Sequence, residues 1–543
     1  MKHAYLFEAR GIQRFLFASG RLRDMLGGSE LLDYLCAPDG LLDKTLQALN
    51  LKPEVVRQAG GAFYLLFDHQ AEAERLCAAW RLGCASWLPG VEYSDAVVKG
   101  GSARAAMQAG HQALREARNR LRADLPNASP LAERSPRTGL AAVKRVGGES
   151  LDAGTHRQRT FDRKDGQSLT QRFLDDRSYT WPRTFEDDGS NEARFPLGER
   201  RMVGLIHADG NGMGELLRVL DEACANADDA TYVRLYRQFS EGLSEATVAA
   251  ARAASETLRP HAGDDKVMPA RPLVLGGDDL TIIIRADLAL DFSTEFLNAF
   301  ERHSGEAMAQ LRAAFVDAGL DAAAAKLPVK LTACAGLCYM KCSQPFLAAH
   351  ALAESLCKRA KAASRAKRKN GEPMPATLAM HRVQDSLLDD ADAQFESEHC
   401  VRHDGVTWQL ALPVYALEAG NALPLIADLL ALKAVFLADA EGKDGFLNDR
   451  PLRELATLMH GNLALAKQAY ERWCEVAIKQ APAAQRRFER SLQALLGPTL
   501  AKLPFSTEAS PQSPLADLLT LLTIGETRSQ PASADRNTEE AAA

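Results

Sequence analysis

The sequence predicts an α+β protein with two ferredoxin-like domains followed by an α-helical C-terminal domain. Three observations predict this fold class: an internal repeat, the order of strands and helices within each copy, and 3.6-residue hydrophobic periodicity near the C-terminus. The expected units are 1–125 for the first domain, 126–200 for a polar connecting segment, 201–390 for the second domain, 391–524 for the helical domain and 525–543 for a disordered tail.

Each copy of the repeat begins with an apolar strand and a turn that opens a helix, at residues 3–11 in the first copy and 202–210 in the second. Each then reaches an apolar hairpin with a Gly-Gly turn, at 55–67 and at 272–284. A helix, another strand and a further helix follow in both copies. This is the β-α-β-β-α-β order of a ferredoxin-like fold.

Composition excludes several classes of protein. The 543 residues are 46% hydrophobic and 25% charged, which is typical of a globular chain and not of a disordered or collagen-like one. The formal net charge of -6 means that any nucleic-acid contact must come from local basic patches. The sequence has neither a secretory signal nor an apolar run of about 20 residues, so we expect a cytoplasmic protein without a membrane partner.

Three carboxylates of the second copy are the candidate catalytic residues. Asp209 ends the first strand, and Asp278 and Asp279 lie in the hairpin turn, which we expect to be exposed. The first strand and the hairpin are neighbours in a ferredoxin-like sheet, so the three carboxylates can converge. Close carboxylates repel each other unless a divalent cation neutralises them, so we expect Mg²⁺ or Mn²⁺ together with a nucleoside triphosphate. Such ions promote attack of a 3′-hydroxyl on an α-phosphate.

Glycines beside these acids suggest a nucleotide site. Gly276 and Gly277 allow a tight turn and a close approach of the backbone to a phosphate or base. Gly210 and Asn211 lie where a helix begins, so its first amides could face a triphosphate.

Aligning the two copies places Arg10, Ala62 and Phe63 opposite the three acids, so we expect the first copy to hold no metal. An Asp-rich hairpin is often only a solvated turn. Two features favour a functional site over that alternative: Asp209 is expected beside the hairpin acids, and the first copy of the repeat has lost all three acids.

Four segments together resemble the large palm-domain (polymerase and cyclase) subunit of type III CRISPR-Cas effector complexes, whose palms are related to GGDEF domains. The segments are GIQRFLFASGRLRDMLGGSELL, IHADGNGMGELL, LVLGGDDLTIII and AGLCYMKCSQPFLAAHALAESLCKRAKAASR. The resemblance is close over residues 1–390, and the C-terminal region matches only in position and class.

The resemblance implies that the chain converts ATP into cyclic oligoadenylates when its complex binds a target RNA paired to the guide RNA. The implied partners are guide RNA, target RNA and other type III subunits. By carry-over, the three acids are the metal ligands, Gly276 and Gly277 form their turn, and the first palm is an inactive copy that helps to form the nucleotide pocket. Lys358, Arg359 and Lys361 are candidate triphosphate contacts, of which we favour Lys361, although a basic helix can also face solvent or RNA.

The sequence departs from the family pattern in two places. Many relatives begin with an HD nuclease domain, whereas this chain opens on the first palm and its His403-Asp404 dipeptide has no preceding helical His ligands, so we expect no DNase activity of that kind. Relatives often carry a zinc-binding cysteine pair between the palms, and none of the ten cysteines here forms a Cys-x-x-Cys pair.

The sequence leaves three other functions open. A diguanylate cyclase uses the same palm, but Asp279 and Leu280 replace the last two residues of its usual turn, and it has no second palm. A catalytically silent scaffold that binds guide RNA and partner subunits would not need all three acids. A palm enzyme that acts outside any complex cannot be separated from a complex subunit by sequence.

Overall fold

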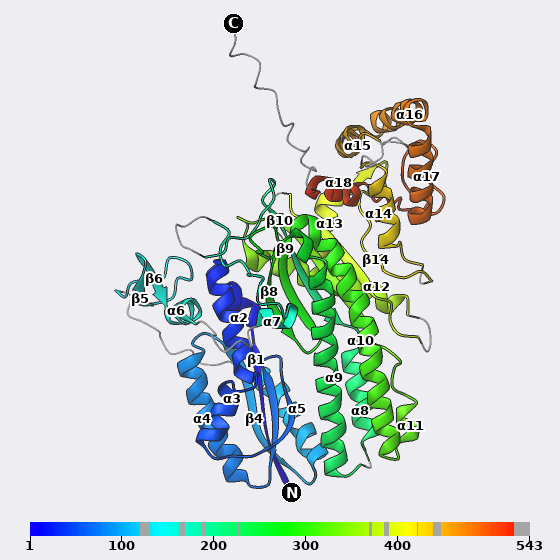
Figure 1. Cartoon of the computed structure of the whole chain (residues 1–543). Coiled ribbons are helices and arrows are strands. Elements are labelled where there is room, and N and C mark those ends of the chain that lie inside the picture. Colours follow the sequence, from blue (N-terminus) through cyan, green and yellow to red (C-terminus); the bar gives the residue numbers. More distant parts are fainter. Residues whose placement is uncertain are drawn as a thin grey trace.

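The computed structural model describes residues 1–119, 131–161, 169–186, 192–225, 227–368, 372–384, 390–420, 422–437 and 447–525. Figure 1 shows two sheet-containing units packed together and a group of helices at the C-terminal end. We call the two units the first palm and the second palm. The expected tail at 525–543 lies outside the described residues except for Gly525, as do parts of the expected connecting segment.

The first palm is a four-stranded antiparallel sheet in the order β2-β3-β1-β4. Helices α1, α2 and α3 connect β1 to β2, α4 connects β3 to β4, and α5 follows β4. The bounds are β1 Lys2–Arg10, α1 Ile12–Phe17, α2 Leu22–Cys36, α3 Leu41–Ala48, β2 Glu54–Ala59, β3 Ala62–Phe67, α4 Gln70–Trp87, β4 Glu92–Gly100 and α5 Ala103–Arg118. This is the predicted ferredoxin-like order.

The second palm repeats this arrangement within a six-stranded sheet, in the order β14-β11-β10-β7-β9-β8. Its strands β8, β9, β7 and β10 correspond to β2, β3, β1 and β4. The bounds are β7 Met202–Gly210, α8 Met213–Ala223, α9 Asp229–Glu256, β8 Ala270–Gly276, β9 Asp279–Arg285, α10 Ala289–Asp317, α11 Asp321–Ala324, β10 Ala333–Lys341, α12 Phe346–Ala366, β11 Thr377–Arg382 and β14 Tyr415–Ala416. The predicted fold class of two ferredoxin-like units is confirmed.

Between the palms, the described residues form a small hairpin and two short helices, and those beyond the second palm are mainly helical. The former are β5 Ala142–Val146, β6 Glu149–Asp152, α6 Ala153–Thr160 and α7 Leu169–Phe173. The latter are α13 Ala391–His399, β12 Cys400–His403, β13 Val406–Gln409, α14 Ile426–Ala434, α15 Arg450–Gly461, α16 Leu463–Gln480, α17 Pro482–Leu496 and α18 Leu515–Ile524. Short 3₁₀ turns lie within the second palm at Arg259–His261 and Ala286–Leu288.

The long helix α9 holds the two palms together. It lies beside α10 along the molecule in Figure 1. Its Arg237 Nε donates a hydrogen bond of 2.8 Å to the carbonyl oxygen of Val55 on β2 of the first palm. Its Thr247 Oγ1 donates a hydrogen bond of 2.6 Å to the carbonyl oxygen of Gly277 in the hairpin turn of the second palm. One helix therefore fixes both hairpins.

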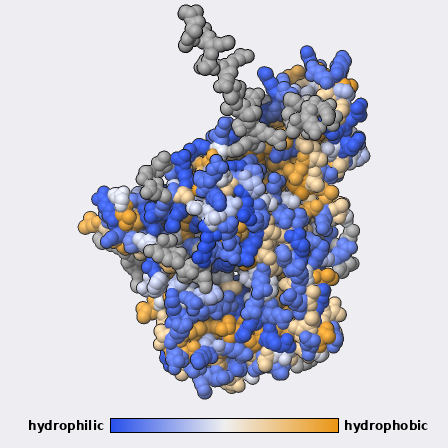
Figure 2. Space-filling model, in the orientation of Figure 1, coloured by the Kyte–Doolittle hydropathy of each residue, from blue (hydrophilic) through white to orange (hydrophobic). Residues whose placement is uncertain are grey.

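The buried core is also shared. Tyr5 and Phe63 of the first palm belong to the same cluster of buried side chains as Leu205 and Ile283 of the second. The face of the molecule in Figure 2 is mostly hydrophilic, with hydrophobic side chains in separate groups. Within the described residues, no helix has both the length and the apolar character needed to cross a membrane.

The strand register corrects our alignment of the two hairpin turns. Ala59 pairs with Ala62 across the first turn, and Gly276 pairs with Asp279 across the second. Asp279 therefore corresponds to Ala62, and Asp278 corresponds to Gly61. The predicted equivalents, Ala62 for Asp278 and Phe63 for Asp279, were wrong by one residue.

The first strand needs a larger correction. Phe7 pairs with Phe63 in the first palm, and Ala208 pairs with Leu280 in the second. Because Phe63 corresponds to Leu280, Phe7 corresponds to Ala208, and the equivalent of Asp209 is Glu8 and not Arg10. The first palm therefore keeps one of the three carboxylates, and it lacks the two in the turn.

A buried carboxylate joins α18 to the second palm and makes stability depend on pH. Asp517 Oδ2 accepts hydrogen bonds from the Leu412 backbone NH at 2.8 Å and from the Tyr415 hydroxyl at 2.6 Å. Burial raises the pKa of Asp517 to about 7. A raised carboxylate pKa means that the folded state binds more protons than the unfolded state, so this contribution to stability is lost as the pH rises from about 4 through about 7.

We expect Asp517→Asn to reduce this pH dependence, because an uncharged amide oxygen can accept the same two hydrogen bonds. Between pH 5 and pH 8, the wild type should lose roughly 2–4 kcal/mol more unfolding free energy than the variant. Urea denaturation at both pH values measures this difference. Equal losses in both proteins would contradict the role given to Asp517.

Candidate functional site

The three predicted acids meet at the end of the second palm hairpin. Asp209 lies near the end of β7, Asp278 lies in the turn, and Asp279 is the first residue of β9. Carboxylate oxygens from all three residues lie within 4.8 Å of one another. The structure therefore brings together the residues that the sequence pattern selected, at the sheet edge where neighbouring strands were expected to place them.

Glycines make this close approach possible. A Cβ atom on Gly210 would lie 2.8 Å from Asp278 Oδ2, so a side chain there would push the turn carboxylate away from β7. Gly277 has φ +63°, the left-handed conformation that favours glycine. A Cβ on Gly276 would lie 2.8 Å from the Cα of Gly60, because the hairpin turns of the two palms face each other.

The turn is half-buried, which corrects the expectation that Asp278 and Asp279 are exposed. Burial and the nearby Asp209 carboxylate raise the pKa of Asp278 and of Asp279 above the usual carboxyl range. The fold thus disfavours the charged form of the two turn carboxylates, and a bound cation would stabilise that form. Three carboxylates of this kind fit a hard divalent cation such as Mg²⁺ or Mn²⁺, which prefers oxygen ligands.

Lys361 supplies positive charge at the site. Its Nζ forms an ion pair with the Asp209 carboxylate and donates a hydrogen bond of 2.8 Å to the Gly210 carbonyl oxygen. Burial disfavours the charged ammonium, but the Asp209 carboxylate outweighs it, so the pKa of Lys361 is raised. The other two basic candidates have different partners. Lys358 Nζ pairs with Glu354 at 2.7 Å, and Arg359 Nε donates to Asp392 at 2.8 Å.

The first palm has the same cation and carboxylate pair. Arg118 forms an ion pair with Glu8, the equivalent of Asp209. Arg118 lies fifteen residues after the first residue of α5, and Lys361 lies fifteen residues after the first residue of α12. The pair therefore occupies matching positions in both palms, and it does not depend on the acids of the turn.

Asn211, a predicted nucleotide contact, is used within the fold. Its side chain is buried, its Nδ2 donates to Thr332 Oγ1 at 2.9 Å, and its Oδ1 accepts from Cys334 Sγ at 3.1 Å. Its backbone NH donates to the Thr332 carbonyl oxygen at 2.8 Å. Asn211 thus fixes the start of α8 against the chain around β10.

A cavity of about 470 Å³ lies between the palms beside the acids. Gly60 and Gly61 of the first palm line it, together with Gly276 and Asp279 of the second. Its volume lies within the range of roughly 300–1,000 Å³ that is usual for ligand pockets. Asp279 thus belongs both to the carboxylate cluster and to the lining of this cavity.

Sequence reasoning missed polar residues that line this cavity. Arg172 lies on α7, in the polar segment between the palms. Its Nη1 donates a hydrogen bond of 3.2 Å to the Leu275 carbonyl oxygen. Arg252 lies on α9 and donates to the Arg172 carbonyl oxygen at 3.2 Å. Ser29 on α2 and Gln58 on β2 also line it. No sequence spacing relates these residues to the acids, because only the packing of the two palms brings them together.

Comparisons with known proteins gave the following results. No protein-family model matches the chain. No curated protein matches it. Among solved structures, the chain is similar to a Csm1-Csm4 cassette in complex with cA4 (13% identity, TM-score 0.45), to the cassette in complex with one ATP (15%, 0.47), and to Csm1 in T. onnurineus (14%, 0.45). Each of these matches covers 96% of this chain and 69% of the other.

The contact between the hairpin turns predicts the effect of a single methyl group. We expect Gly276→Ala to destabilise the protein by about 1–3 kcal/mol, because the new Cβ would meet the Gly60 backbone, which cannot rotate away. Gly214→Ala is the matched control, since a Cβ at this exposed position on α8 meets no atom within 4 Å. It should be neutral or stabilising by up to about 1 kcal/mol. Urea denaturation compares the two variants, and equal stability of both would contradict the tight contact.

Proposed function

We propose that this chain is the large palm-domain subunit of a type III CRISPR effector complex and that its second palm converts ATP into cyclic oligoadenylates. One observation carries the proposal: Asp209, Asp278 and Asp279 converge within 4.8 Å beside a cavity between two palms. The motifs around these acids support the choice of family. A carboxylate cluster beside a ligand-sized cavity, with raised pKa values at Asp278 and Asp279, is typical of a catalytic site.

Asp209, Asp278 and Asp279 are the residues that would hold Mg²⁺ or Mn²⁺. When bound, the ions would supply Lewis-acid stabilisation of the attacking and leaving oxygens in phosphoryl transfer. The protein contributes the fixed geometry. Gly210 and Gly277 allow the turn carboxylates to approach β7, and α9 holds the turn through Thr247.

In the proposed reaction, the 3′ oxygen of one ATP forms a bond to the α-phosphorus of another, and the bond to the pyrophosphate group breaks. The 3′-hydroxyl loses its proton as the new ester forms. Repetition extends the chain, and the final attack joins its two ends into a ring. Lys361 is on α12, and its ammonium group contacts Asp209 and Gly210 at the end of β7. The same group can therefore also bind the negatively charged triphosphate.

The first palm has a supporting role in this proposal. Its turn, Gly60–Gly61, lines the cavity opposite Gly276 and Asp279, and glycine leaves room for a nucleotide close to the backbone. Gly61 and Ala62 carry no carboxylate where the second palm has Asp278 and Asp279. Only the second palm therefore has a full acidic set. We propose guide RNA, target RNA and other type III subunits as the partners that control it.

The first test removes the charge of the turn acids. We expect Asp278→Asn with Asp279→Asn to lower ATP conversion by at least about 10³-fold, because two of three metal ligands lose their charge. The folded protein should be as stable as the wild type or more so, since mutual repulsion is relieved. The matched control is Glu8→Gln in the first palm, which should keep activity. The measurement is product formation from labelled ATP by the purified complex with target RNA and Mg²⁺.

The same assay separates the alternatives. Cyclic di-GMP from GTP, without oligoadenylate from ATP, would mean that the chain is a diguanylate cyclase. Absence of any reaction under all triggers would favour the silent scaffold. Activity of the chain alone, without guide RNA or other subunits, would favour an enzyme that acts outside a complex.

The second test concerns Lys361. We expect Lys361→Met to lower kcat/KM for ATP by roughly 10- to 100-fold, the effect of losing one charge-assisted hydrogen bond. Lys358→Met is the control, because Lys358 lies on the same helix and pairs with Glu354 away from the acids. Steady-state kinetics of both variants measure the difference. Equal effects of the two substitutions would remove Lys361 from the site.

A further inference from the structure

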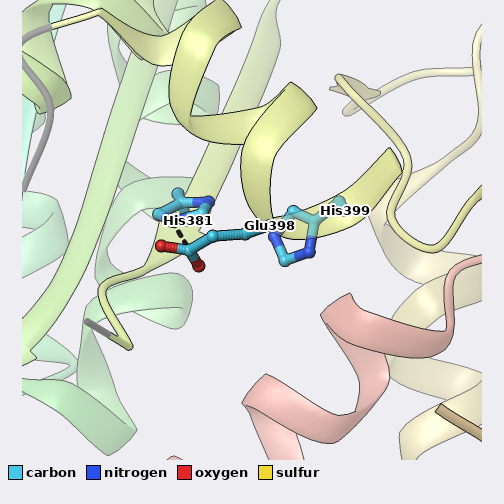
Figure 3. Close-up of side chains that lie close together, drawn as sticks. All are labelled: His381, Glu398 and His399. Atoms are coloured by element: carbon cyan, nitrogen blue, oxygen red, sulfur yellow. Dashed lines mark ion pairs between the residues drawn. The ribbon is translucent and has the colours of Figure 1, made fainter. Parts of the chain in front are cut away.

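A second cluster of metal-binding side chains lies beyond the palm acids. His381 is on β11, and Glu398 and His399 are the last two residues of α13. Each offers one ligand atom, and the three atoms lie within 4.8 Å of one another. Figure 3 shows the Glu398 carboxylate directed at the His381 ring, with the His399 ring beside it.

The cluster is well buried. The side chain of His381 is 2% exposed and that of Glu398 is 12% exposed, and His399 is also buried. His381 Nε2 and Glu398 Oε2 lie 3.3 Å apart, close enough for an ion pair. Neither atom has a well-aligned hydrogen-bond partner. Polar atoms without well-aligned hydrogen bonds are costly inside a protein, and a metal ion bound by both would satisfy them.

The spacing suits a first-row transition metal. Two ligands of a tetrahedral ion with metal-ligand bonds near 2.0–2.1 Å lie about 3.3 Å apart. The His381 and Glu398 atoms already have this separation. The His399 nitrogen lies within 4.8 Å of both, and its ring would have to move closer to complete the set. Two imidazole nitrogens and one carboxylate oxygen suit Zn²⁺ and ions of similar softness better than Mg²⁺.

We propose that His381, Glu398 and His399 bind one divalent transition-metal ion of the Zn²⁺ class, with water in the remaining position. The proposal is independent of the palm chemistry, because it uses none of the residues placed in that site. The ion would tie the end of α13 to the sheet of the second palm.

Neighbouring contacts support a structural role for such an ion. Gln394, one turn earlier on α13, donates a hydrogen bond from its Nε2 to Glu398 Oε1 and so fixes the carboxylate that faces His381. At its other end, α13 is held to α12, where Ser355 Oγ accepts from the Ala391 backbone NH at 2.9 Å. α12 also carries Lys361. A metal at the far end of α13 would hold the first C-terminal helix at both ends.

The test measures metal binding by the full chain without an affinity tag. The protein is stripped with a chelator, returned to buffer with saturating Mg²⁺, and titrated with Zn²⁺ or Co²⁺ against a chromophoric competitor. Metal content is then measured by mass spectrometry, and thermal unfolding is followed with and without the added ion. Mg²⁺ is present so that the palm carboxylates do not take up the probe metal.

Four variants make the test specific. His381→Phe with His399→Phe keeps the ring shapes and removes both nitrogens, and Glu398→Gln removes only the carboxylate charge. His261→Ala is the control for an exposed histidine, and Asp278→Asn with Asp279→Asn removes the palm ligands. We expect about one ion per chain and a higher Tm with metal in the wild type and in both controls. The double Phe variant and Glu398→Gln should bind at least about tenfold more weakly, since even loss of a ligand's supporting partner has such an effect.

The wild-type result alone can overturn the proposal, whether or not the variants fold. Less than about one tenth of an ion per chain, or no change in Tm with Zn²⁺ or Co²⁺, would mean that the cluster is a metal-free polar contact. Binding that survives the double Phe variant would place the metal elsewhere. Binding lost only with the palm acids would assign it to the palm.

Discussion

Electrostatic repulsion among three half-buried carboxylates is the constraint around which the second palm is built. The fold brings Asp209 to the hairpin turn against that repulsion, and burial together with the Asp209 carboxylate raises the pKa values of Asp278 and Asp279. Gly210 and Gly277 have no side chains, which permits the close approach of the turn to β7. The hydrogen bond from Thr247 on α9 to the turn holds this arrangement. A site that is strained without a cation is prepared to bind one.

The fold and the acids could be predicted from sequence because both depend on local signals. Alternating apolar residues around each Gly-Gly pair define the hairpins, and the position of Asp209 after an apolar strand places it next to the turn. The register between the copies could not be predicted this way. Matching Gly-Gly pairs is natural in an alignment, but the pairing of Gly276 with Asp279 shows that the turn is shifted by one residue.

The remaining parts of the site depend on contacts between distant segments. Arg172 and Arg252 reach the cavity from a connecting segment and from α9, and no spacing relates them to the acids. Asn211 has the sequence context of a nucleotide contact, but its amide meets Thr332 and Cys334 instead. The pair of His381 with Glu398 joins a strand and a helix end whose sequence separation is not that of a metal motif.

The contact between the two turns also bears on why the palms differ. Gly60 and Gly276 touch, so the turn positions of both palms share one small volume. If Gly61 and Ala62 were aspartates, they and Glu8 would add a second acidic set near the first. The two sets would compete for the same counterions and raise each other's pKa values. Two pseudo-symmetric palms in such close contact therefore favour different turns. The turn of the second palm carries the carboxylates, and the turn of the first palm provides uncharged space beside them.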